Sequence, residues 1–380
     1  LKRRNSLPGY STNHAYMTEA LALARRGLGQ VSPNPAVGAV VVRDGEIVGR
    51  GFHTWAAKDH AETVALREAG VAARGATVYV TLEPCAHEGR TGPCAEALIA
   101  AGVARVVAAM EDPNPLVRGQ GFAKLRTAGV EVEIDPSFTQ AALKLNEPFV
   151  HFMRTRRTLV TLKAAVTLDG KIAAPEDNSG WITSERARAH VQELRHQHDA
   201  ILTGIGTVAA DDPLLTDRSG LPRSRPFLRL IADSQLRLAV DSKMVKSAQS
   251  DLVVVTTSAA SKERREALER KGVEVWTMDG PGGRTDLRQV VARLAERKYL
   301  SLMIEAGSKL NWAVLEAGIA DKVFFYYAPK ILGGMQSLPV AGGAGMKRRV
   351  DAIRMRDLEL HSIPPDEFAV ERWVVKPEWS

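Results

Sequence analysis

His60, Cys85 and Cys94 are residues of types that bind zinc, and all three lie within the first hundred positions of the chain. One imidazole and two thiolates leave the fourth position of a tetrahedral zinc ion open, as a catalytic site requires. Zinc-bound water loses a proton near neutral pH, and the resulting hydroxide can attack an amidine carbon. Glu62 lies two residues after His60, where a carboxylate can move protons without binding the metal. This pattern predicts zinc-dependent hydrolytic deamination of a pyrimidine-like base.

The spacing of the two cysteines is unusual for this chemistry. Eight residues separate Cys85 from Cys94, whereas the common deaminase signature has two residues between its cysteines. The alternative interpretation is a structural zinc site, or a chance His-x-Glu beside two inert thiols. The pair Pro84-Cys85 follows an expected strand, and the chain has only two cysteines, so the catalytic interpretation is favoured.

Alternating helices and strands surround these residues. An Asp-Gly turn at positions 44–45, between two apolar runs, predicts a β-hairpin. The alternation implies a sheet covered by helices, with parallel strands in its second part. The expected helices are 14–28, 60–69, 94–101 and 122–128, and the expected strands are 38–42, 47–51, 77–82, 103–110 and 130–134.

The chain has 380 residues, which predicts two domains. The polar, basic stretch 154–158 is the expected boundary, giving domains of residues 1–155 and 156–380. A second α/β alternation follows this stretch. Its expected strands are 158–166, 200–203, 226–233, 251–256, 273–277, 301–305 and 322–328, and its expected helices are 184–198, 261–271, 286–297 and 309–317.

Two glycine-containing turns follow strands in this second domain. They are residues 204–207 and 305–308, and each lets the backbone approach a ligand's phosphate closely. Each turn taken by itself is more often a simple strand-to-helix connection. The domain offers no nucleophile–base pair and no second metal set. Reduction by a nicotinamide cofactor needs neither, because the cofactor carries the hydride.

Composition limits the range of partners. The net charge is +7 and spread along the chain, and aromatic residues make up only 6%. A nucleic-acid-editing deaminase with an RNA-binding second half would need a basic stripe with interleaved aromatics, so no nucleic-acid partner is expected. A zinc-stabilised binding module without catalysis would not need Glu62. No run of about 18 apolar residues is present, and Lys2, Arg3 and Arg4 precede no apolar segment, so no membrane association and a cytoplasmic location are expected.

Several motifs resemble those of the bifunctional riboflavin-biosynthesis deaminase–reductase family. In the first domain they are Pro33–Gly38, His60–Glu62, Thr81–His87, Gly89–Cys94 and Asp112–Pro115. In the second they are Leu168–Ala173, Ser179–Ser184, Ala210–Thr216 and Ala328–Gly334. The resemblance runs from about Tyr16 to the C-terminus. It implies a cytidine-deaminase-like three-layer domain followed by a dihydrofolate-reductase-like α/β domain.

The resemblance also implies a substrate, cofactors and site residues. The substrate would be 2,5-diamino-6-ribosylamino-4(3H)-pyrimidinone 5′-phosphate, which is deaminated before its ribose is reduced open with NADPH. Zn²⁺ and NADPH are the implied cofactors, and a homodimer or higher homo-oligomer is expected. The implied cofactor contacts are Ala165, Trp181, Thr207, Asp211, Ser234, Gly307, Ser308, Lys309, Leu310, Asn311, Trp312 and Ala313. The implied substrate contacts are Ser179, Arg195, Leu215, Arg218 and Glu305.

Some residues keep two interpretations. The Asn34 amide suits either a pyrimidine edge or a turn cap, and His53 and His87 are either substrate contacts or structural residues. Lys163 either contacts the substrate or only packs the aliphatic part of its side chain in the interior. Arg195 and Arg218 are suited to grip a phosphate by charge-assisted hydrogen bonds, although an arginine on a helix is by default solvated.

Overall fold

The computed structural model describes residues 12–87, 92–176 and 179–376. The chain divides into two compact units, Leu1–Arg156 and Arg157–Ser380. The sequence places the boundary between residues 155 and 156. Within the described ranges, no helix has both the length and the apolar character needed to cross a membrane.

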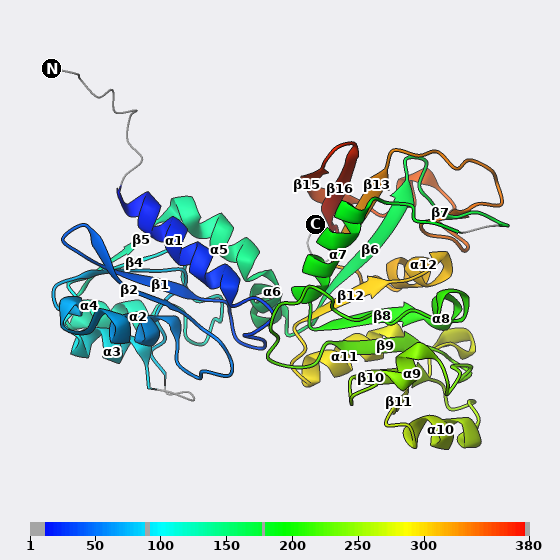
Figure 1. The fold of residues 1–380 in the computed structure, drawn as a ribbon, viewed down its shortest axis with the longest axis horizontal. Coiled ribbons are helices and arrows are strands. Elements are labelled where there is room, and N and C mark those ends of the chain that lie inside the picture. The colour runs from blue at the N-terminus through cyan, green and yellow to red at the C-terminus, as the bar shows by residue number, and fades with distance from the viewer. Residues whose placement is uncertain (1–11, 88–91, 177–178, 377–380) are drawn as a thin grey trace. The chain divides into compact units, whose positions relative to one another are not determined.

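The first unit is built on a five-stranded sheet with the order β2-β1-β3-β4-β5. The strand β1 pairs antiparallel with β2 and β3, whereas β3, β4 and β5 run parallel. Helices α1 and α5 cover one face and α2, α3 and α4 cover the other, which gives three layers (Figure 1). The strands are β1 (Gly38–Arg43), β2 (Glu46–Phe52), β3 (Thr77–Val80), β4 (Arg105–Ala108) and β5 (Glu131–Ile134). The helices are α1 (Thr12–Arg26), α2 (Ala61–Ala69), α3 (Cys94–Ala100), α4 (Gln120–Thr127), α5 (Thr139–Leu145) and α6 (Glu147–Thr155), with short 3₁₀ turns at Gly70–Ala73 and Pro136–Phe138.

Two glycines of β2 bring α2 close to the sheet. A Cβ atom at Gly49 would lie 2.2 Å from the carbonyl oxygen of Ala65, and one at Gly51 would lie 2.1 Å from that of Ala61. Any side chain at these positions would therefore push the helix away from the sheet. Because α2 begins directly after His60, this close packing fixes the height of His60 and Glu62 above the sheet.

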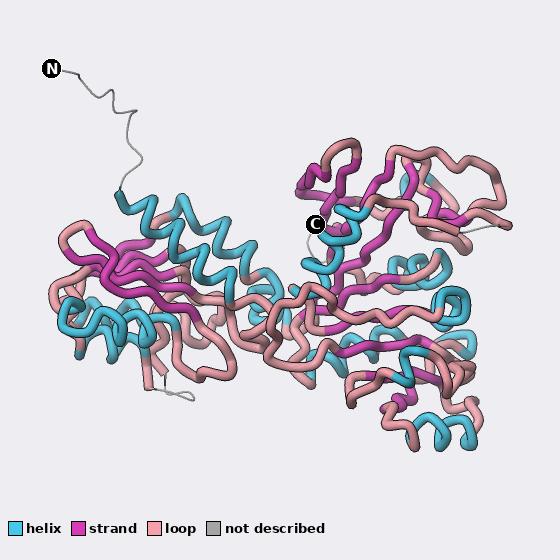
Figure 2. Tube along the Cα trace, viewed as in Figure 1, coloured by secondary structure: helices cyan, strands magenta, loops and turns pink. Residues whose placement is uncertain are grey.

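The second unit is built on a nine-stranded sheet with the order β11-β10-β9-β8-β12-β6-β13-β16-β15. The seven strands from β11 to β13 are parallel to their neighbours, and β16 and β15 are antiparallel. Figure 2 shows these strands between the helices. The strands are β6 (Leu159–Thr167), β8 (Ala200–Gly204), β9 (Leu228–Ala232), β10 (Leu252–Thr256), β11 (Glu274–Thr277), β12 (Ser301–Glu305), β13 (Lys322–Ala328), β15 (Met355–Ile363) and β16 (Glu367–Val374). The short strands β7 (Lys171–Ala173) and β14 (Leu338–Pro339) pair separately.

Apolar cores lie on both faces of this sheet. One core includes residues of α7, α8, α9 and α10, and the other includes residues of α11 and α12. Strands buried on both faces read as continuous apolar runs, as β10 does over residues 252–255. The helices are α7 (Glu185–His196), α8 (Ile205–Asp211), α9 (Lys243–Lys246), α10 (Lys262–Glu269), α11 (Leu287–Glu296) and α12 (Ser308–Glu316), with short 3₁₀ turns at Pro281–Gly283 and Arg349–Asp351.

The order of the parallel strands determines where a ligand can bind. The strand β12 lies between β8 and β6, although it follows both in the chain. The strands β9, β10 and β11 therefore lie on one side of this point in the sheet, and β13 lies on the other side. In open α/β sheets, ligands bind beyond the carboxyl ends of the strands at such a switch point. The two glycine turns singled out in the sequence follow β8 and β12, so they lie at this edge.

Some elements were not expected from the sequence. The helices α5, α6, α8 and α9 are absent from the sequence-based assignment, as are the C-terminal strands β15 and β16. The residues of β15 are mostly exposed, so this edge strand lacks the apolar run by which the central strands are recognised.

His198 should make the stability of the second unit depend on pH. Its Nδ1 donates to the carbonyl oxygen of Leu194 (2.7 Å), and burial lowers its pKa from 6.5 to about 4. Below pH 6.5 His198 binds a proton in the unfolded chain, whereas in the folded chain it stays neutral until about pH 4. The free energy of unfolding should therefore fall by roughly 3 kcal/mol as the pH decreases through this window. Urea unfolding followed by tryptophan fluorescence at pH 7 and pH 5 tests this, and His198→Gln should reduce the dependence. An equal pH dependence in this variant would show that other groups cause it.

Candidate functional site

The first part of the candidate site lies at the start of α2. His60 has an extended backbone (φ −76°, ψ 159°) and immediately precedes the helix, and Glu62 lies in its first turn. The side chain of Glu62 is buried.

Cys85 and Cys94 complete a three-residue cluster with His60. The Nδ1 atom of His60 lies 3.2 Å from Sγ of Cys94 and 3.5 Å from Sγ of Cys85. The three candidate ligand atoms all lie within 4.8 Å of one another. Cys94 is the first residue of α3, and its backbone N–H donates to Sγ of Cys85 (3.3 Å). The loop between the cysteines therefore does not separate their sulfur atoms.

This cluster fits a tetrahedral zinc ion. With Zn–N near 2.0–2.1 Å and Zn–S near 2.3 Å, tetrahedral geometry separates nitrogen from sulfur by about 3.6 Å. The pKa of Cys85 is lowered to about 4, chiefly by the hydrogen bond from the Cys94 thiol and also by His60. The same hydrogen bond raises the pKa of Cys94. Without a cation the pair thus favours one thiolate, and a bound dication would supply the charge that stabilises two.

Glu62 has the electrostatic environment of an acid–base group. Burial raises its pKa to about 7, and the negative charge of Cys85 acts in the same direction. A carboxyl group with a pKa near the working pH can both accept and return a proton. The geometry therefore brings together all four residues that the sequence singled out for deamination.

Asn34 and His53 form a hydrogen-bonded chain beside this cluster. Nδ2 of Asn34 lies 3.1 Å from Nε2 of His53, and Nδ1 of His53 lies 2.9 Å from the carbonyl oxygen of Asp59. The rings of His53 and His60 meet edge to face, with centroids 5.2 Å apart. His87 is exposed. Residues 89–91 of the Gly89–Cys94 motif lie outside the described residues.

The second part of the candidate site lies at the carboxyl edge of the nine-stranded sheet. Gly307, before α12, lies beside Thr207 of α8, since a Cβ on the glycine would be in ordinary van der Waals contact (3.7 Å) with Oγ1 of Thr207. The turns after β8 and β12 are thus neighbours. Ser234 lies at the same edge, two residues after β9, and its Oγ accepts a hydrogen bond from the Thr285 N–H (3.1 Å).

An ion-pair cluster occupies the switch point. Oε1 of Glu305 lies 2.9 Å from Nζ of Lys163, and Oε2 accepts hydrogen bonds from Nε (3.1 Å) and Nη2 (2.8 Å) of Arg195. Burial raises the pKa of Glu305, but the two cations outweigh it and lower the pKa to about 2. Arg195 also donates to the carbonyl oxygen of Thr216 (3.0 Å). Arg195 is thus buried and paired, unlike a solvated helix arginine.

The other implied contacts differ in exposure. Asp211, Arg218 and Ser179 are exposed, and Trp181 is exposed beneath the guanidinium of Arg188 (4.7 Å from the ring centroid). Ala165 of β6 is partly buried. The side chain of Leu215 is buried in the core that includes α7, so only its backbone can meet a ligand.

The start of α12 is held by a following segment of the chain. Oγ of Ser308 donates to the carbonyl oxygen of Pro339 (2.5 Å), and Nδ2 of Asn311 donates to that of Val340 (2.7 Å). These two side chains therefore anchor the segment 339–340. Lys309 is exposed, and Leu310, Trp312 and Ala313 are partly buried.

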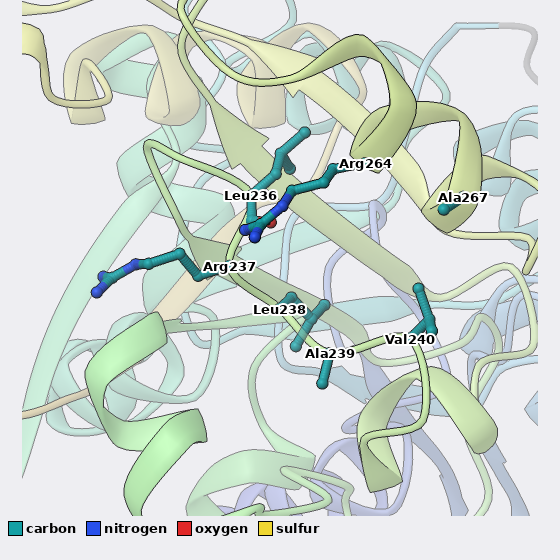
Figure 3. Close-up of a pocket in the computed structure, with 7 residues that line it drawn as sticks. All are labelled: Leu236, Arg237, Leu238, Ala239, Val240, Arg264 and Ala267. Atoms are coloured by element: carbon teal, nitrogen blue, oxygen red, sulfur yellow. The ribbon is translucent and has the colours of Figure 1, made fainter.

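A pocket with a volume of about 240 Å³ follows β9 (Figure 3). Arg264 reaches across Leu236 and donates to its carbonyl oxygen (3.1 Å). The lining residues are Leu236, Arg237, Leu238, Ala239, Val240, Arg264 and Ala267. The pocket is separate from the ion-pair cluster and contains none of the residues that the sequence singled out.

Two family models match the chain, one in each unit. Residues 10–110 match the cytidine and deoxycytidylate deaminase zinc-binding region, and residues 158–367 match the RibD C-terminal domain. The riboflavin biosynthesis protein RibD of Escherichia coli is 42% identical over 366 residues, covering 92% of this chain and 96% of that protein. The chain belongs to the RibD family. The RibD protein of Actinobacillus pleuropneumoniae is 40% identical over 366 residues, covering 96% of each chain.

Solved RibD structures share the fold. That of Acinetobacter baumannii RibD has a TM-score of 0.84 at 37% identity and covers 96% of this chain and 99% of its own. A diaminohydroxyphosphoribosylaminopyrimidine deaminase/5-amino-6-(5-phosphoribosylamino)uracil reductase from Thermotoga maritima has a TM-score of 0.78 at 35% identity, with the same coverage. The expected family and both expected fold classes are confirmed. The chain is thus a bifunctional deaminase and reductase of riboflavin biosynthesis.

Two residues near these sites were not singled out from the sequence. The carboxylate of Asp169 accepts hydrogen bonds from the N–H groups of Leu332 (3.1 Å) and Gly333 (2.7 Å), which joins the loops after β6 and β13. Glu83, two residues before Cys85, binds several backbone N–H groups. Both residues occur inside motifs that carry the family resemblance, but their partners are distant in the sequence.

Proposed function

We propose that this RibD protein deaminates 2,5-diamino-6-ribosylamino-4(3H)-pyrimidinone 5′-phosphate at the His60–Cys85–Cys94 cluster. Its second unit then reduces the ribosyl group of 5-amino-6-(5-phosphoribosylamino)uracil to the ribityl group with NADPH. The convergence of one imidazole, two sulfurs and the buried carboxylate of Glu62 supports the first step most strongly.

The roles in deamination follow from these positions. His60, Cys85 and Cys94 would hold Zn²⁺, which supplies an activated water at its open position. Glu62 accepts one proton from the attacking water and passes it to the ring nitrogen. It then accepts the second proton from the hydroxyl group that has been added to the pyrimidine ring and passes it to the amino group, which leaves as ammonia as the carbonyl group forms. The buried position and raised pKa of Glu62 suit both transfers. Asn34 and His53 lie beside the cluster, where they orient the pyrimidine.

The roles in reduction rest on the switch point. NADPH would supply the hydride, with its phosphates at the turns that carry Thr207 and Gly307. Glu305 keeps Lys163 and Arg195 charged and oriented. In this arrangement Lys163 can donate a proton to the ring oxygen of the ribose when the ring opens. Arg218, exposed after α8, is suited to the substrate phosphate.

The remaining implied contacts complete this proposal. Ala165, Trp181, Asp211, Ser234 and the α12 start from Gly307 to Ala313 contact the cofactor, and Ser179, Leu215 and Glu305 contact the substrate. A deaminase unit of residues 1–155 and a reductase unit of 156–380 match this division of roles. We also propose a homodimer, since two-fold assemblies are the commonest oligomers, and no nucleic-acid partner. A cytoplasmic location agrees with two free cysteines.

Turnover and metal content test this function directly. Purified protein should contain about one zinc per chain, release ammonia from the diaminopyrimidine ribotide, and then oxidise NADPH. Chelation should abolish ammonia release and leave NADPH oxidation with the deaminated ribotide unchanged. Transfer RNA serves as a control substrate. Ammonia from transfer RNA but not from the ribotide would contradict the proposal, as would full deamination after zinc removal.

A further inference from the structure

Glu83 is a buried carboxylate that binds four backbone N–H groups. Its Oε2 accepts from Asp112 (3.0 Å) and Gly119 (2.9 Å), and its Oε1 accepts from Gly121 (2.9 Å) and Phe122 (3.4 Å). The side chain is only 4% exposed. A carboxylate with this many donors is held in one position, since charge-assisted hydrogen bonds are among the strongest in proteins.

The donors come from one segment that begins at the end of β4 and ends in α4. The N–H groups of Gly121 and Phe122 lie in the first turn of α4, where free N–H groups and the helix dipole favour an anion. The backbone N–H of Glu83 also donates to the carbonyl oxygen of Met110 (3.0 Å). Segment 110–122 is therefore attached to Glu83 at both of its ends.

The turn Glu83-Pro84-Cys85 connects this attachment to the metal ligands. A Cβ at Gly121 would lie 1.8 Å from the carbonyl oxygen of Pro84, so α4 rests directly on the turn. On the other side, the N–H of Cys94 donates to Sγ of Cys85. The turn thus carries the carboxylate of Glu83, which accepts hydrogen bonds at the start of α4, and the sulfur of Cys85, which accepts one at the start of α3.

We propose that Glu83 is a positioning residue for deamination. By fixing segment 110–122 against the turn, it sets the position of Cys85 Sγ relative to His60 and Cys94. This inference rests on the proposed zinc-dependent function. Residues that orient metal ligands without touching the metal typically contribute 10–100-fold to metal affinity or activity.

Glu83→Gln tests this role. The amide replaces one acceptor oxygen with an NH₂ group, which faces two backbone donors. We expect zinc affinity, measured by competition with a chelator, to fall by roughly 10–100-fold. The visible spectrum of the cobalt-substituted protein should change, because it reports the geometry of the thiolate ligands. NADPH oxidation with the deaminated ribotide should match that of the parent.

Asp135→Ala is the control, because loss of a helix-capping carboxylate costs roughly 1 kcal/mol of stability. Asp135 lies in the same unit and caps a short helix by accepting from the Ser137 N–H (3.0 Å), remote in sequence from the ligands. The control should lower the unfolding temperature without changing zinc affinity or the cobalt spectrum. Equal zinc weakening in both variants would overturn the proposal in favour of general destabilisation.

The remaining outcomes are also decisive. Parent-like zinc affinity and cobalt spectrum in Glu83→Gln would overturn the positioning role. If that variant does not fold, Glu83→Asp keeps the charge but shortens the side chain by one methylene, so intermediate weakening is expected and parent-like affinity overturns the role. A parent protein that binds no zinc would instead contradict the proposed function itself.

Discussion

Glu62→Gln should lower the rate of deamination by roughly 10²–10⁴-fold, the usual contribution of a general acid–base group. Glutamine has the same shape but cannot take a proton from the attacking water. Because Glu62 is not among the three clustered metal ligands, zinc content should stay at the parent level. Ammonia release from the diaminopyrimidine ribotide, measured alongside metal analysis, checks both expectations.

Glu68→Gln provides the comparison for this variant. Glu68 lies on the same helix, is exposed, and accepts a hydrogen bond from the Arg50 N–H (3.0 Å) away from the cluster. It should deaminate at the parent rate. In both variants NADPH oxidation with the deaminated ribotide should be unchanged. Normal ammonia release by Glu62→Gln would mean that another group moves the proton.

Lys163→Met should slow NADPH oxidation by roughly 10²–10⁴-fold, since the proton donor for the reduced sugar is removed. Glu305 would still be paired with Arg195 through two hydrogen bonds, so the carboxylate does not become an unpaired buried charge. Stopped-flow absorbance at the nicotinamide band, with the deaminated ribotide as substrate, measures this step. Ammonia release should stay at the parent rate.

Lys163→Arg tests whether the reaction needs only the positive charge of Lys163 or also its transferable proton. An arginine keeps the ion pair with Glu305 but holds its proton too tightly to transfer it. Its rate should therefore resemble that of Lys163→Met. Recovery of the parent rate in Lys163→Arg would show that only the charge matters, and an unimpaired Lys163→Met would remove Lys163 from the reaction.

The sequence by itself determined the chemistry of the first unit. The types and order of His60, Glu62, Cys85 and Cys94 predict a zinc deaminase, because one imidazole and two thiolates leave a metal position open and a carboxylate two residues after the histidine is the arrangement of the zinc nucleobase deaminases. The apolar runs of the central parallel strands were also readable, since both of their faces are buried. The edge strand β15 was not, because most of its residues are exposed.

Only the tertiary structure decided which residues meet. Lys163, Arg195 and Glu305 are more than a hundred positions apart at their extremes, and strand order places them together at the switch point. The four donors to Glu83 are backbone N–H groups, which every residue except proline carries. The amino-acid types therefore do not identify these donors. Only the folded position of the segment 110–122 shows which N–H groups reach Glu83.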